Sequence, residues 1–104
     1  MQVLLGSTFK DGNDKVIING DVGQGTPFML RDAIKQALLT PFEDERSLAL
    51  EEKVKRYDLY LKVKDAVDPA DFTSVEVVQM KKVVGKAYGV LIVGQAVKML
   101  EGKS

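Results

Sequence analysis

The distribution of glycine most constrains how this chain of 104 residues can fold. Five of the nine glycines fall in the first 25 residues, none lies between Thr26 and Val84, and four follow from Gly85 onward. Glycine favours turns and weakens helices, because it loses the most backbone freedom on folding. We therefore expect one α+β domain over residues 1–104 that is mainly helical, with a turn-rich β-hairpin region over 1–28 and three or four packed helices over 29–104.

The amino-terminal part contains short apolar or β-branched runs at residues 3–5, 8–9 and 16–18. The last two flank Asp11-Gly12-Asn13-Asp14, residues that favour a tight turn, which predicts a β-hairpin. A third short strand is expected over 26–28, after a second turn cluster. The glycines of that second cluster follow a GxxGxG order with no Lys-Ser or Lys-Thr after it, so they predict a turn rather than a phosphate-binding loop.

From Met29 onward the apolar residues recur at the spacing of a helix. The first helix should end ahead of Pro41, because a residue before proline avoids helical geometry. A longer second helix is expected from an N-cap at Ser47 to about Val67, with Glu–Lys and Asp–Lys pairs at i, i+4. The buried face expected for the first helix is Leu30, Ala33, Ile34, Ala37 and Leu38, and that for the second is Leu50, Val54, Tyr57 and Leu61.

A third helix carries the clearest local signal in the chain. Thr73-Ser74-Val75-Glu76 has the spacing of a capping box, and Phe72 with Val77 has that of a hydrophobic staple, so the helix should begin here. Gly85 and Gly89 weaken it and predict a break near Gly89. A fourth helical segment over 90–101 should close with Gly102 as its C-cap. The buried stripe expected for the third helix is Val77, Met80, Val84 and Tyr88.

Composition limits the chemistry available to the protein. With no cysteine and no histidine, disulfides, thiol nucleophiles and imidazole bases are excluded, and the remaining acids form no convergent set, so we expect no enzyme, no cofactor and no metal site. Fifteen basic residues balance fifteen acidic ones. Because nonspecific binding to nucleic acid depends on excess positive charge, we expect no nucleic-acid partner.

We also expect no contact with a membrane. The first residues lack the basic and apolar segments of a signal peptide. The most apolar region, over 83–100, is interrupted by Lys86 and Lys98, which leaves far fewer than the roughly 20 residues of a membrane span. These features favour a cytoplasmic protein.

The stretch from Val77 to Leu100 is apolar on more than one side, and contains four lysines and no acid. Four consecutive residues over 90–93 point in directions about 100° apart on a helix, which one small domain can hardly cover. Two interpretations stay open: a central core helix, or a core helix that is also the seam of a homo-oligomer. The candidate interface residues are Tyr88, Val90, Ile92, Val93, Gly94 and Val97.

Four segments in order, FKDGNDKVI, LRDAIKQALL, EEKVKRYDLYLKV and VVGKAYGVLIVGQAVKMLEG, resemble a type of small protein found in tailed bacteriophages and prophages. The resemblance extends over nearly the whole chain. It implies a phage origin, residence in the host cytoplasm and action by binding. We expect a non-enzymatic accessory protein that binds and modulates a host or phage protein; the alternative is a small structural or morphogenesis component, such as an assembly chaperone or a connector.

Overall fold

The computed structural model describes residues 2–19, 26–42, 47 and 49–101, and in these ranges the chain is a mainly helical α+β protein, as predicted. Its helices are α1 (Leu30–Leu39), α2 (Leu50–Asp65), α3 (Ser74–Ala87) and α4 (Val90–Leu100). The short strands are β1 (Gln2–Val3), β2 (Ile18–Asn19), β3 (Thr26–Pro27) and β4 (Ala70–Asp71).

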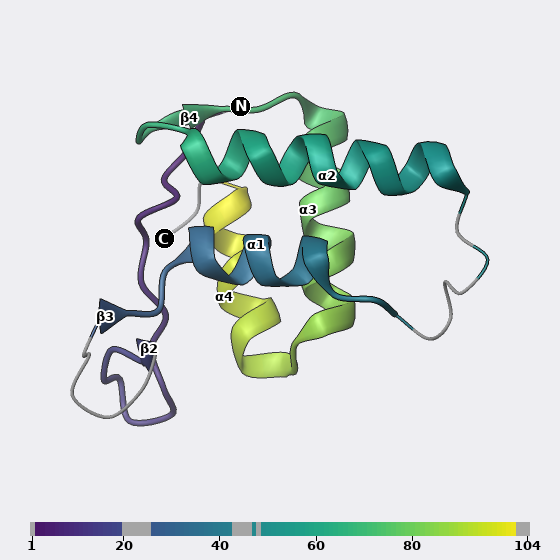
Figure 1. Ribbon diagram of the computed structural model, residues 1–104. Helices are drawn as coiled ribbons and strands as arrows, with labels where there is room; N and C mark the ends of the chain where they lie inside the picture. Colours follow the sequence, from purple (N-terminus) through teal and green to yellow (C-terminus); the bar gives the residue numbers. More distant parts are fainter. Residues whose placement is uncertain (1, 20–25, 43–46, 48, 102–104) are drawn as a thin grey trace.

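The helices form two crossing layers. Figure 1 shows α1 and α2 running across α3 and α4; α1 packs against both α2 and α3, and α3 packs against α4. The buried side chains form one hydrophobic cluster that includes residues from the amino-terminal segment and from every helix. Its largest fully buried members include Phe9, Phe72, Leu30, Ile34 and Met80.

The predicted β-hairpin forms at the amino terminus. The Asp11 carboxylate accepts hydrogen bonds from the backbone N–H groups of Asn13 (2.8 Å) and Lys15 (3.1 Å), and it thereby holds the turn predicted there. β2 then pairs antiparallel with β3, so the expected third strand is present as well. The Phe9 ring lies against the Phe28 ring, with centroids 5.2 Å apart, which seats the hairpin on the core.

The first apolar run does not join this hairpin. β1 pairs antiparallel with β4, with Val3 opposite Ala70, so a strand also lies within the region expected to be only helical. Asp68 also joins the two chain segments that form this strand pair. Its carboxylate accepts hydrogen bonds of 2.7 Å from the N–H groups of both Leu5 and Gly6. A Cβ on Gly6 would lie 2.7 Å from Asp68 Oδ2, so this approach requires glycine.

α1 and its buried face agree with the prediction, but α2 differs at its start, at its end and in the face that it buries. It begins at Leu50 with Ala49 as N-cap rather than at Ser47, and it ends at Asp65 rather than near Val67. Leu50, Val54 and Tyr57 are 73%, 50% and 54% exposed, so the predicted inner face is wrong.

The opposite side of α2 faces the core, where Arg56, Leu59 and Val63 are buried. One physical reason is a contact with α1: the Arg31 guanidinium donates hydrogen bonds to the carbonyls of Val63 (2.6 Å) and Lys64 (3.1 Å), in the last turn of α2. This contact joins the carboxyl end of α2 to α1.

The capping box of α3 is confirmed. Thr73 Oγ1 accepts from the N–H of Glu76 at 3.1 Å, and Glu76 Oε1 accepts from the N–H of Thr73 at 2.8 Å. Phe72 and Val77, the two staple residues, are both buried. The predicted break is also confirmed, because α3 ends at Ala87 and Gly89 is the N-cap of α4. The expected C-cap at Gly102 lies outside the described residues.

The predicted buried stripe of α3 is largely correct. Val77, Met80 and Val84 are buried, and Val83 joins them, whereas Tyr88 is only partly buried. Across the described ranges, no helix combines the length and apolar character that crossing a bilayer would require.

Candidate interaction surfaces

The six candidate interface residues lie at the corner between α3 and α4, but they do not share one exposed face. Val90 is 91% exposed and Gly94 is also exposed. Ile92, Val93 and Val97 are partly buried, and the first two pack against the core cluster. The part of this set that is open to a partner therefore consists of Val90 and Gly94, next to Leu91, which is 49% exposed.

Tyr88 belongs to the inside of this corner. Its hydroxyl donates a hydrogen bond to Gln36 Oε1 of α1 at 3.0 Å, and its ring meets the Phe28 ring edge-on at 6.1 Å. Burial raises the pKa of Tyr88 above 10.0, and the nearby charge of Asp32 raises it further. Tyr88 thus ties the end of α3 to α1 and stays protonated at neutral pH.

Gly94 has no side chain, which would let another backbone approach α4 closely at this position. A Cβ built on Gly94 meets no atom within 4 Å, so no neighbouring segment of the described chain uses this space. The next residue is Gln95, whose side-chain amide accepts from Lys10 N–H at 2.9 Å and donates to Lys10 O at 2.8 Å. Sequence reasoning missed this link between α4 and the hairpin, because only the fold brings residues 85 positions apart together.

A second surface comes from α2, whose apolar residues face outward. We call Leu50, Val54, Tyr57 and Leu61 the α2 outer face; Leu61 is partly buried and the other three are exposed. On a helical wheel with 100° per residue these four lie within about 60° of one another, so they form one stripe. The Tyr57 ring stacks on the Tyr60 ring, with centroids 6.1 Å apart.

Charged side chains border the α2 outer face, and the two borders differ in sign. Lys53 and Lys64 follow one edge, whereas Asp58 and Asp65 follow the other, and all four are exposed. The sequence predicts that these four residues share one face of the helix, which is correct. The prediction that this face is buried is wrong, because it faces outward.

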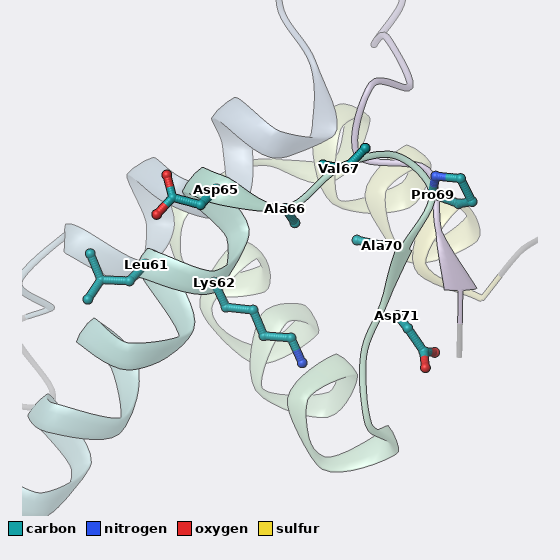
Figure 2. A pocket seen from close by; sticks show the side chains of 8 residues that line it. All are labelled: Leu61, Lys62, Asp65, Ala66, Val67, Pro69, Ala70 and Asp71. Atoms are coloured by element: carbon teal, nitrogen blue, oxygen red, sulfur yellow. The ribbon is translucent and has the colours of Figure 1, made fainter.

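A shallow hollow of about 550 Å³ lies beside the end of α2 (Figure 2). Figure 2 shows Asp65 pointing away from Lys62, and Asp71 on the far side of the hollow. Lys62 Nζ lies 2.8 Å from Glu76 Oε1 and 4.8 Å from the centre of the Phe72 ring. Since Asp65 and Asp71 are directed to different sides and Lys62 contacts α3, these groups do not converge on a bound molecule.

The same Lys62 contact shapes the electrostatics of the α3 cap. Burial alone would raise the pKa of Glu76, but hydrogen bonds from Lys62 and from the Thr73 backbone N–H, with the Lys62 charge and the Thr73 side chain, outweigh it. The pKa of Glu76 therefore lies below its ordinary value of 4.5. These contacts indicate a structural role for Glu76 at the start of α3.

Among the residues that the structure describes, no three aspartates or glutamates are grouped as metal ligands would be. Comparison with protein-family models, with curated proteins and with solved structures finds no match for this chain.

Proposed function

We propose that this chain acts by binding another protein and not by catalysis, as a phage accessory protein that modulates a host or phage enzyme or a defence factor in the host cytoplasm. The observation that supports this function is the α2 outer face. Its members recur at i, i+4, i+7 and i+11, the spacing with which an amphipathic helix presents anchor residues to a partner groove.

A partner that covers this stripe would gain free energy of association. Removing apolar surface from water gains roughly 25 cal/mol per Å², so three large apolar side chains left at 50% to 73% exposure favour association. Tyrosine adds to this, because it is enriched among the residues that dominate binding energy at interfaces.

The test is affinity capture from a bacterial lysate with the tagged protein, followed by mass spectrometry. Val54→Glu places a charge in the α2 outer face, and Val78→Glu makes the same substitution at an exposed valine of α3 (64% exposed). We expect a partner that is retained by the wild type and by Val78→Glu, and lost with Val54→Glu. Identical sets of captured proteins for all three would contradict the proposal.

The exposed start of α4 favours a second candidate function, a structural or morphogenesis component. Val90 and Leu91 give an exposed apolar surface in addition to the α2 outer face, and a protein that contacts copies of itself through two different surfaces can form a ring or a filament. In that case the mass in light scattering would rise beyond a dimer with concentration, and Val90→Glu would reduce it. If Val90→Glu leaves the mass unchanged at every concentration, this second function is contradicted.

A further inference from the structure

We infer that the α2 outer face pairs with the same face of a second copy of this chain, as a short, parallel, two-stranded coiled coil. This inference rests on the proposed function in one respect, the use of α2 as a protein-binding surface, and it adds a second copy of the chain as an occupant of that surface. Spacing, helix orientation and charge each support it.

The spacing is that of a coiled-coil seam. The intervals between Leu50, Val54, Tyr57 and Leu61 are four, three and four residues, which assigns Leu50 and Tyr57 to heptad position d and Val54 and Leu61 to position a. Among parallel coiled coils, a β-branched residue at a with leucine at d favours two strands. Val54 and Leu50 follow that rule, whereas Leu61 at a and Tyr57 at d do not.

The orientation of α2 leaves Leu50, Val54 and Tyr57 of this seam exposed, whereas Leu61 is partly buried. Leu59 and Val63, which bury α2 against the core, lie about 180° and 220° around the helix from Leu50. In Figure 1 the first turns of α2 also extend beyond α1 and α3 at the edge of the molecule. A second α2 can therefore approach the exposed part of the outer face, from Leu50 to Tyr57.

The charged residues beside the α2 outer face favour a second copy of the chain as its partner and a parallel arrangement of the two helices. Lys53 occupies position g and Asp58 occupies position e, five residues later, and both are exposed. In a parallel pair each g residue lies beside the e residue five positions further along the other helix, so Lys53 of each copy meets Asp58 of the other. Tyr60 and Asp65 stand in the same relation, so a hydroxyl donor faces a carboxylate.

The antiparallel alternative is disfavoured by the same residues. In an antiparallel pair, the residues at position e of one helix lie beside the residues at position e of the other. Asp58 would then lie beside Glu51 or Asp65 of the second copy, and like charges in contact repel. The α2 outer face thus complements itself in one direction only.

The length of the seam sets the strength of the dimer. The twelve residues from Leu50 to Leu61 span about 16 Å of helix, shorter than most stable interfaces require. We therefore expect a weak dimer with a dissociation constant of about micromolar order, whose measured mass rises with concentration toward twice 11.4 kDa.

Sedimentation equilibrium on the purified protein tests the inference through a charge swap. Lys53→Glu should weaken the dimer about tenfold at low salt, because two attractive contacts become repulsive, and Asp58→Lys should do the same. The double variant Lys53→Glu/Asp58→Lys restores opposite charges and should recover most of the affinity. Circular dichroism shows that each variant keeps its helices, and Val78→Glu serves as the control that leaves the dimer intact.

Single-cysteine variants test the direction, since the chain has no cysteine of its own. In a parallel pair each residue faces its own copy, so Leu50→Cys and Leu61→Cys should each form a disulfide-linked dimer when oxidised alone, whereas Val78→Cys should not. Disulfide formation only in a mixture of the first two would indicate an antiparallel pair and overturn the inference.

A constant mass of 11.4 kDa at all concentrations, or a dimer that is unaffected by both charge variants, would also overturn it. The proposed function is separated from these outcomes by the lysate experiment: a monomer that captures a partner sensitive to Val54→Glu retains the proposed function and loses only the second copy as its partner. A monomer without such a partner loses both.

Discussion

Thr73 and Glu76 show how much a few neighbouring residues can determine. Each side chain accepts a hydrogen bond from the other's backbone N–H, at 3.1 Å and 2.8 Å, so two N–H groups at the start of α3 are satisfied. Both partners lie within four positions of the chain. The cap could therefore be predicted from the sequence alone, together with the staple that Phe72 and Val77 form beside it.

Thr73→Ala removes the hydroxyl that accepts from Glu76 N–H. We expect the free energy of unfolding to fall by about 1 kcal/mol and the melting temperature by roughly 4–8 °C, the usual size for a lost N-cap in a domain of this length. Ser74→Ala, at an exposed neighbouring position, is the control and should stay within about 0.5 kcal/mol. Equal effects for the two variants in thermal unfolding would contradict the role of Thr73.

The Glu76 carboxylate makes this cap sensitive to acid. Its pKa in the folded chain lies below the value of 4.5 expected when the chain is unfolded, so the carboxylate stabilises the fold above pH 4.5. That contribution should be lost as the pH falls from 4.5 through the lower folded pKa. We expect the difference in urea midpoint between wild type and Glu76→Gln to be largest near neutral pH and to shrink below pH 4.5; a difference that stays constant with pH would refute this.

At the scale of elements, α2 shows where periodicity stops being informative. The helix itself was predictable, because its glutamates and lysines favour helix and Lys55 pairs with Glu52 at 3.6 Å within it. Its buried side was not, since Leu50 with Val54 and Leu59 with Val63 both recur at i, i+4. Contacts with α1, including the hydrogen bonds from Arg31, decide between the two faces.

The same substitution, leucine to alanine, distinguishes the buried face of α2 from the exposed one by its effect on stability. Leu59 is 6% exposed and Leu50 is 73% exposed. Leu59→Ala should lower the free energy of unfolding by about 2–4 kcal/mol, because it removes core contacts and leaves a cavity, whereas Leu50→Ala should change it by about 0.5 kcal/mol or less. Denaturant unfolding of dilute protein, below the concentration at which copies associate, gives both numbers. The reverse order would restore the face predicted from the sequence.

At the scale of the whole molecule, the attachment of the amino-terminal segment to the rest of the chain depends on hydrogen bonds between residues that are distant in sequence. Asp68 binds the backbone at Leu5 and Gly6, and Gln95 binds both backbone groups of Lys10. Local patterns predict the mainly helical class, the hairpin turn and the break before α4, because each depends on neighbours in sequence. The pairing of β1 with β4 and the outward direction of the α2 stripe depend on these distant contacts, so the pattern could not supply them.

Net charge is also a property of the whole molecule, and it predicts whether the protein binds nucleic acid. Basic and acidic residues balance at fifteen each, and two lysines of α3, Lys81 and Lys86, have contacts of their own. Lys81 Nζ lies 3.2 Å from Glu101 Oε1, and Lys86 Nζ lies 5.6 Å from the centre of the Phe42 ring. A phosphate backbone would have to compete with these contacts, and it would release few counterions in return.

We therefore expect no appreciable binding to duplex DNA at physiological salt. The measurement is fluorescence anisotropy of a labelled duplex, titrated with the protein at two salt concentrations, with Lys81→Ala/Lys82→Ala as the matched variant. Submicromolar binding that weakens steeply with salt and is lost in the variant would contradict the expectation, since a salt-dependent affinity measures phosphate contacts directly. If such binding is absent, association with protein through the α2 outer face and the exposed start of α4 is favoured, because both present apolar side chains, which attract protein surfaces and not phosphate.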